Sequence, residues 1–158
     1  PRAAGVRLPA ADTAAIRTSR DGYRLTPDGP GWRLEIVATY TNRTGRAVYV
    51  RHGGGRQPGF RLEKREGDAW TAAFAPAVPL VAEPPSVVAP GASRTDTLVV
   101  LASAPGLGAP AFTVDSIPGT YRVVYDLYAT STVESMVALL SDPLPVEARS
   151  SNPFQLDR

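Results

Sequence analysis

The sequence predicts an all-β protein, built as an antiparallel sandwich of about seven to nine strands. Apolar and polar side chains alternate along residues 32–42, and a second alternating run covers 120–129; both runs are typical of strands with one buried face. Sixteen prolines and 14 glycines divide the 158 residues too often for long helices. We expect residues 1–13 to form an N-terminal arm and 14–158 a single sandwich domain.

Short strands joined by tight turns are expected in the first third of the chain. Residues 14–20 and 22–26 are strand candidates, and the long strand 32–42 follows a glycine and proline cluster. Asn42–Gly45 then form a turn into strand 46–51, so strands 32–42 and 46–51 should pair antiparallel. Asn42 opens a glycosylation sequon, but the arginine bias of the chain indicates a bacterial origin, which favours a role of Asn42 in the turn.

The middle of the chain predicts a hairpin followed by an edge segment. A glycine-rich loop, 52–59, precedes two strands, 60–65 and 69–74, that are joined by a turn centred on glycine. Residues 75–90 contain five prolines, which suits an edge or crossover better than a central strand. The next strand covers 93–101.

The last third contains the second core strand, 120–129, after an expected extended piece at 112–115. A final strand, 145–156, is interrupted by Asn152-Pro153, which suits an edge or a bulge. Two interpretations remain open for 132–140. Ser131 and Glu134 have capping-box spacing and Val133, Met136, Val137 and Leu140 recur at helical intervals, which predicts a short helix; the alternative is a strand over 136–140.

Composition excludes several classes of function. The net charge is only +2 and the arginines are dispersed, so no nucleic-acid partner is expected. The absence of cysteine excludes disulfides, thiolate nucleophiles and cysteine-bound metals. No apolar run is long enough to span a membrane, although association with a membrane complex is compatible with the sequence. The chain begins at Pro1 without an initiator methionine, which favours a processed, exported protein of the periplasm or cell surface over a cytoplasmic one.

Catalytic and metal-binding motifs are incomplete. His52-Gly53-Gly54-Gly55 matches an oxyanion-hole tetrad of some esterases, but the Gly-x-Ser-x-Gly elbow that such enzymes need is absent. The acidic residues do not follow a calcium-loop spacing. We therefore expect no enzyme, no metal and no cofactor.

Candidate binding residues lie in the long connections. In an antiparallel sandwich, the connections 52–59, 75–92 and 130–143 leave from the same end, which is the predicted binding face. The apolar run Met136–Leu140 is the segment expected to contact a partner, because exposed apolar patches mark interfaces. The candidate residues are His52, Arg56, Phe60, Met136, Val137, Leu139 and Leu140.

Strand and turn motifs carry a family resemblance. Residues 34–42 followed by 48–50, then Pro90-Gly91 and Pro118–Arg122, resemble bacterial immunoglobulin-like domains, among them the proteinase-inhibitor type. The resemblance implies the sandwich architecture and a tyrosine, Tyr121, near the start of a late strand. The function expected is a non-catalytic, exported interaction domain, such as a peripheral subunit of an envelope or membrane complex; the alternative is a protease inhibitor or peptide-binding module.

Overall fold

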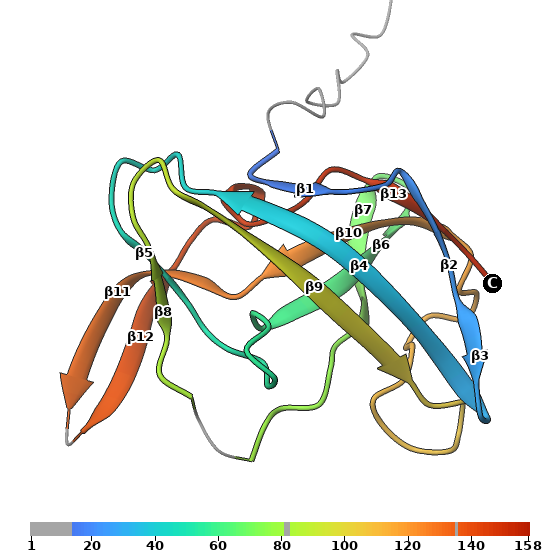
Figure 1. Cartoon of the computed structure of the whole chain (residues 1–158). Coiled ribbons are helices and arrows are strands. Elements are labelled where there is room, and N and C mark those ends of the chain that lie inside the picture. Colours follow the sequence, from blue (N-terminus) through green and yellow to red (C-terminus); the bar gives the residue numbers. More distant parts are fainter. Residues whose placement is uncertain (1–13, 81–82, 135) are drawn as a thin grey trace, which may run out of the picture.

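The structure is a computed structural model that describes residues 14–80, 83–134 and 136–158 (Figure 1). Within this part of the chain, 13 strands form three sheets, and the one helical element is a single 3-10 turn, η2 (Val146–Ala148). The all-β class is therefore confirmed. The predicted arm, 1–13, lies outside the described residues.

Sheet A is built on the two longest strands. β4 (Gly31–Thr41) and β9 (Ser93–Ala102) pair antiparallel along their whole length. β1 (Ile16–Thr18) and β3 (Thr26–Asp28) pair with the two ends of the other edge of β4. Alternate residues of β4, from Leu34 to Tyr40, are buried as the periodicity predicts.

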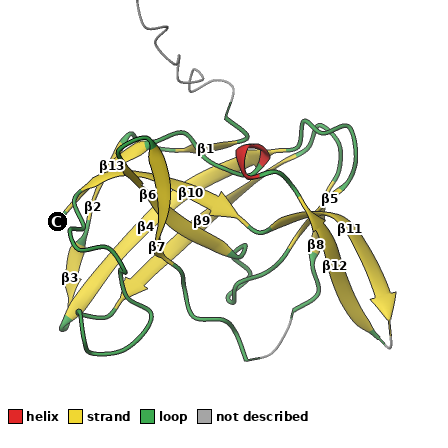
Figure 2. Ribbon diagram, turned by 180° about the vertical axis from the view of Figure 1, so that it is seen from behind, coloured by secondary structure: helices red, strands yellow, loops and turns green. Residues whose placement is uncertain are grey.

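Sheet B packs behind sheet A (Figures 1 and 2). Its strand order is β2 (Gly22–Arg24), β13 (Phe154–Asp157), β10 (Gly119–Tyr125), β6 (Phe60–Glu66) and β7 (Ala69–Phe74). β6 and β7 form the predicted hairpin. β13 lies between β2 and β10, so the prediction of one long last strand with an edge proline is wrong; only 154–157 is a strand, and Pro153 precedes it.

The core lies between these two sheets. Tyr40, Tyr121 and Tyr125 are fully buried, as predicted, and the Tyr121 ring stacks on Phe154 with 6.4 Å between centroids. Trp32 is half-buried at the rim and packs against the core. The predicted extended piece at 112–115 is not a strand; its Phe112 ring lies 5.3 Å from that of Phe74.

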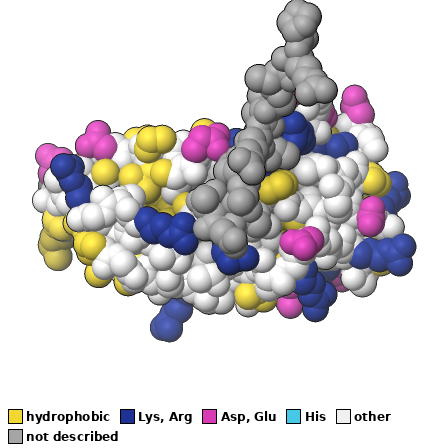
Figure 3. Space-filling view, turned by 90° about the horizontal axis from the view of Figure 1, so that it is seen from above, with side chains coloured by type: hydrophobic (Ala, Val, Ile, Leu, Met, Phe, Trp, Pro, Cys, Tyr) yellow, Lys and Arg dark blue, Asp and Glu magenta, His cyan; other side chains and the backbone are white. Residues whose placement is uncertain are grey.

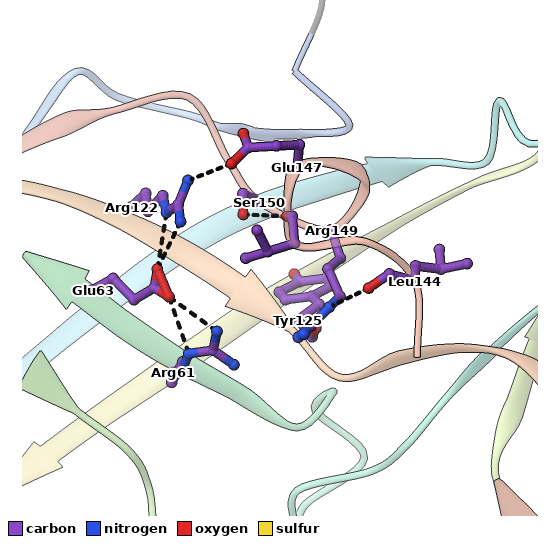
Figure 4. Close-up of polar contacts among 9 residues, drawn as sticks. Arg61, Glu63, Arg122, Tyr125, Leu144, Glu147, Arg149 and Ser150 are labelled. Carbon is purple, nitrogen blue, oxygen red and sulfur yellow. Dashed lines mark hydrogen bonds and ion pairs between the residues drawn. The ribbon is translucent and has the colours of Figure 1, made fainter. Parts of the chain in front are cut away.

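β10 is buried on both faces, which alternation alone does not predict. Residues 149–151 pair with β10 beyond the end of β13, as when Ser151 N–H donates to the Val123 carbonyl at 2.8 Å, and η2 just before them carries Glu147 to Arg122. Arg122 is consequently buried, and its guanidinium stacks over the Trp70 ring at 4.6 Å. It bonds to Glu63 beneath and Glu147 above (Figure 4).

Sheet C forms one end of the molecule. Its order is β12 (Val137–Pro143), β11 (Leu127–Glu134), β5 (Val48–Val50) and β8 (Ser86–Val88). The predicted pairing of strands 32–42 and 46–51 is wrong, since β5 pairs with β8 and β11. The buried Asn42 amide donates to the carbonyls of Arg46 and Val88, which directs the chain away from β4 and into sheet C.

The strand count exceeds the predicted seven to nine because long predicted strands are divided between sheets. Run 120–129 passes from sheet B to sheet C at Asp126, between β10 and β11. Gly59 allows this crossing, because a Cβ there would collide with the Asp126 carboxylate. Within the proline-rich segment, β8 is a sheet edge, as predicted.

Candidate partner-binding site

The β11–β12 hairpin projects from the body of the protein at the end formed by sheet C (Figures 1 and 2). Its strands pair from Tyr128↔Pro143 to Glu134↔Val137. The helix alternative for 132–140 is therefore wrong and the strand alternative is right. β-Branched residues such as Thr130, Thr132 and Val137 lose side-chain freedom in a helix but pack well on a pleated surface, and this preference outweighs the helical spacing.

Large apolar side chains are exposed on and around this hairpin. Met136 is 97% exposed and Leu139 is 45% exposed. Hydrophobic side chains gather toward the same end of the surface (Figure 3). Seven of the ten exposed large apolar residues found in the described part of the chain lie in sheet C, in the β11–β12 turn or in residues 76–80: Val78, Leu80, Val87, Val133, Met136, Val137 and Leu139.

The outer edge of β12 carries free backbone groups. β12 is the end strand of sheet C, and none of the strands in the described part of the chain pairs with its other side. Alternate residues of an edge strand direct N–H and C=O groups outward, where they form a template for another strand. Val137 and Leu139 flank this edge on one face of the hairpin, opposite Glu134 and Thr132.

The hairpin also borders an apolar groove. Ala138 and Leu140, which lie on the face opposite Val137 and Leu139, line this groove together with Leu139. Residues of the proline-rich segment cover the groove from the other side, and its volume is about 320 Å³. The groove is lined by Arg51, His52, Val78, Pro79, Glu83, Pro85, Ala138, Leu139 and Leu140.

A polar pocket of about 460 Å³ adjoins this groove and shares His52 and Glu83 with it. Arg56, Ser86 and Arg94 complete its polar lining. Arg94 is held by a bidentate pair with Asp96, from Nε to Oδ2 and from Nη2 to Oδ1, both at 2.8 Å. These hydrogen bonds raise the pKa of Arg94, so its guanidinium stays protonated and paired with the Asp96 carboxylate in the pocket wall.

Tyr125 lies beneath this wall, in the core. Its hydroxyl has no hydrogen-bond partner among the described residues, although the side chain is fully buried. Burial raises the pKa of Tyr125, and the negative charge of Asp96 adds to the effect. The phenol therefore stays neutral and contributes no charge to the pocket.

The structure brings some of the predicted site residues together and separates others. His52, Leu139 and Leu140 line the apolar groove, Arg56 lines the adjoining polar pocket, and Met136 and Val137 are exposed near the hairpin turn. Phe60 is 4% exposed in the core, so its assignment to the binding surface is wrong. It begins β6, opposite Tyr125 of β10, and its side chain belongs to the inner face of sheet B.

Sequence reasoning missed Arg51, Glu83, Ser86 and the prolines that cover the groove. Ser86 reaches His52 because β8 pairs with β5, and no local pattern in the proline-rich segment signals that pairing. In the part of the chain that the structure describes, no three histidine or acidic side chains gather as a metal site. No described helix has the length and apolarity to cross a bilayer.

Comparison with protein-family models and with curated proteins finds no match for this chain.

Proposed function

We propose that this protein is an interaction module that binds an extended segment of a protein partner as an added strand along the outer edge of β12. The unpaired edge, flanked by exposed apolar side chains, is the observation that carries the proposal. Backbone hydrogen bonds supply affinity in such complexes, and contacts with alternate side chains supply specificity.

The chemistry of the edge defines the partner segment. Val137 and Leu139 point to the same face, so a bound strand with apolar residues at every second position covers them while its backbone pairs with β12. Long exposed strand edges without charged residues pair unspecifically with other strands. The acidic Glu134 and Asp142, near the two ends of β12, reduce such unspecific pairing. Lysine or arginine at the ends of the partner segment complements these charges.

The immunoglobulin-like type of the sandwich is part of this proposal. Tyr121 near the start of β10 donates its hydroxyl hydrogen to the Ile117 carbonyl, four residues upstream, at 2.5 Å. A tyrosine bonded back across the corner in this way is a hallmark of immunoglobulin-like domains. We further propose an exported, accessory role in an envelope or membrane-associated complex, which rests on the sequence expectations alone.

The inhibitor alternative finds less support in the loop 52–59. Strand-like pairing with a target requires an extended backbone. Gly54, Gly55 and Arg56 instead all have positive φ, and Gly53 and Gln57 bond across the loop. Peptide binding through an edge strand, the other form of that alternative, coincides with the function proposed here.

Selection of displayed eight-residue peptides on the purified domain tests this function. We expect enriched peptides to alternate apolar and polar residues, and to bind Leu139→Asp about 10- to 100-fold more weakly than wild type, since a buried leucine contributes roughly 1.5–3 kcal/mol. Leu101→Asp is the matched control, because Leu101 is also 45% exposed but lies on β9. Equal loss in both variants, or no enrichment above an unrelated domain, would overturn the proposal.

A further inference from the structure

The only histidine of the chain is held in one tautomer by two hydrogen-bond partners. His52 Nδ1 lies 3.1 Å from the Arg56 backbone carbonyl, and Nε2 lies 2.5 Å from Ser86 Oγ. A carbonyl oxygen can only accept, so in the neutral ring Nδ1 carries the hydrogen and donates it. Nε2 is then the acceptor, and Ser86 must donate its hydroxyl hydrogen to it.

Strand pairing fixes this geometry. Ser86 of β8 stands opposite Val50 of β5 and therefore shares its face of sheet C. His52 follows Val50 by two residues and bridges to Pro58, which closes the loop that carries the Arg56 carbonyl. Both side chains are half-buried, and both line the polar pocket.

We propose that Ser86 is an acyl-accepting nucleophile and His52 its general base, with carboxylic esters as the substrate class. A hydroxyl within hydrogen-bond reach of a base that a third group orients is the arrangement by which serine is activated. This activity goes beyond the proposed partner binding and revises the expectation that the chain is not an enzyme. That expectation rested on a missing Gly-x-Ser-x-Gly segment, whereas the same roles arise from unrelated segments in different folds.

The proposed ester hydrolysis needs only Ser86, His52 and water. Ser86 Oγ attacks the ester carbonyl carbon and its proton passes to His52 Nε2; the bond to the alcohol oxygen then breaks, and the alcohol leaves with that proton. Water, activated by the same nitrogen, attacks the acyl-serine, and the proton returns to Ser86 as the carboxylic acid is released. The Arg56 side chain lines the same pocket, and in this proposal it supplies the positive charge that stabilises the oxyanion.

The two adjoining cavities define which ester fits. His52 belongs to both the apolar groove and the polar pocket. A small apolar acyl chain suits the groove beside Leu139 and Leu140, and a polar alcohol suits the pocket, whose lining includes Arg56 and Glu83.

Labelling of the purified protein with a fluorophosphonate probe, followed by peptide mass mapping, tests the assignment. We expect one adduct, on Ser86, absent in Ser86→Ala and unchanged in Ser141→Ala, whose serine is exposed on β12. His52→Gln should slow labelling about 100- to 10,000-fold, the usual contribution of a general base. Hydrolysis of 4-nitrophenyl butyrate should show the same order among the variants.

The position of the adduct in the wild-type protein tests the assignment of Ser86 as the nucleophile even if a variant fails to fold. Absence of an adduct on Ser86, or labelling of folded His52→Gln at the wild-type rate, would leave the Ser86–His52 bond as a structural link between loop 52–59 and β8, and would overturn the proposal. Peptide binding by Ser86→Ala is measured separately. A negative labelling result therefore overturns the proposed esterase activity and does not bear on the proposed partner binding.

Discussion

Arg122 donates two hydrogen bonds to one carboxylate oxygen of Glu63, from Nε at 3.0 Å and from Nη2 at 2.8 Å, in a layer closed to solvent. Only 8% of each side chain is exposed. The other Glu63 oxygen accepts from Arg61 (Figure 4). The two residues lie opposite each other on β10 and β6, so the pair joins two strands that are distant in sequence, and Arg122 also reaches Glu147 of η2 at 3.4 Å.

Glu63→Leu should lower the free energy of unfolding by about 3–5 kcal/mol, because it leaves the Arg122 charge buried without its main partner. Urea unfolding measures the loss. Glu35→Leu is the matched control: Glu35 also bonds to an arginine, Arg33, at 2.8 Å, but both side chains are about half exposed. Such a pair contributes about 0–1 kcal/mol. Similar losses in the two variants would contradict the account of this layer.

Tyr125→Phe should raise the free energy of unfolding by about 1 kcal/mol. The substitution removes a buried hydroxyl that has no partner among the described residues and keeps the ring in place. Tyr121→Phe provides the comparison, because the Tyr121 hydroxyl bonds to the Ile117 carbonyl and its loss should cost about 0.5–1.5 kcal/mol. If both variants are destabilised alike, the Tyr125 hydroxyl has a partner and this prediction is wrong.

Alkaline pH should destabilise the protein through its buried tyrosines. Burial raises the pKa of Tyr40 to about 12, and it also raises the pKa values of Tyr121 and Tyr125. The pKa of tyrosine in an unfolded chain is about 10. As the pH rises from about 10 to about 12, the unfolded chain therefore loses phenol protons that the folded chain keeps, and unfolding becomes more favourable.

Each such tyrosine lowers the stability by at most about 1.4 kcal/mol per pH unit in this range. Urea unfolding at about pH 9 and about pH 11 measures the slope. Tyr40→Phe should make the slope shallower while the stability at neutral pH changes little. A stability that is constant across this range would contradict the buried, neutral state of these phenols.

Much of sheets A and B could be predicted from local patterns. The alternation along 32–42 identified β4 and its buried face, and the glycine-centred turn identified the β6–β7 hairpin. Burial of Arg122 could not be predicted, because it depends on contacts with Glu63, Trp70 and Glu147, which are distant from it in sequence. Solvent access to a residue depends on every segment that crosses it, whereas periodicity reports only one strand's own faces.

In the candidate site, too, local patterns predicted some features and long-range contacts determined the others. Apolar character identified Met136–Leu140, but its spacing fitted both a helix and a strand, and the preference of β-branched residues for strands together with the pairing with β11 decided between them. Phe60 follows the glycine-rich loop 52–59 and is a candidate for the binding surface by sequence, yet β6 begins there and buries it. The contact of Ser86 with His52 depends on long-range pairing of β5 with β8, for which the sequence carries no local signal.

Asn42→Ala should lower the free energy of unfolding by about 1–3 kcal/mol, because it leaves the Val88 carbonyl without its 2.8 Å bond at a buried position. Thermal unfolding followed by circular dichroism measures the change. Thr44→Ala, in the exposed part of the same turn, should cost less, since water can replace the bonds of its hydroxyl. If the two variants lose equal stability, Asn42 does not hold the entry into sheet C as described.

Hydrogen exchange along β12, with and without a selected peptide, tests the central claim most directly. In the free protein, alternate amides of residues 137–142 that face away from β11 should exchange rapidly, since β12 is the end strand of its sheet. When the peptide is bound, these amides should become protected by at least about tenfold, while those of the outer edge of β8 keep their rates. Protection that falls on β8 or on loop 52–59 and leaves β12 unchanged would contradict binding by strand addition.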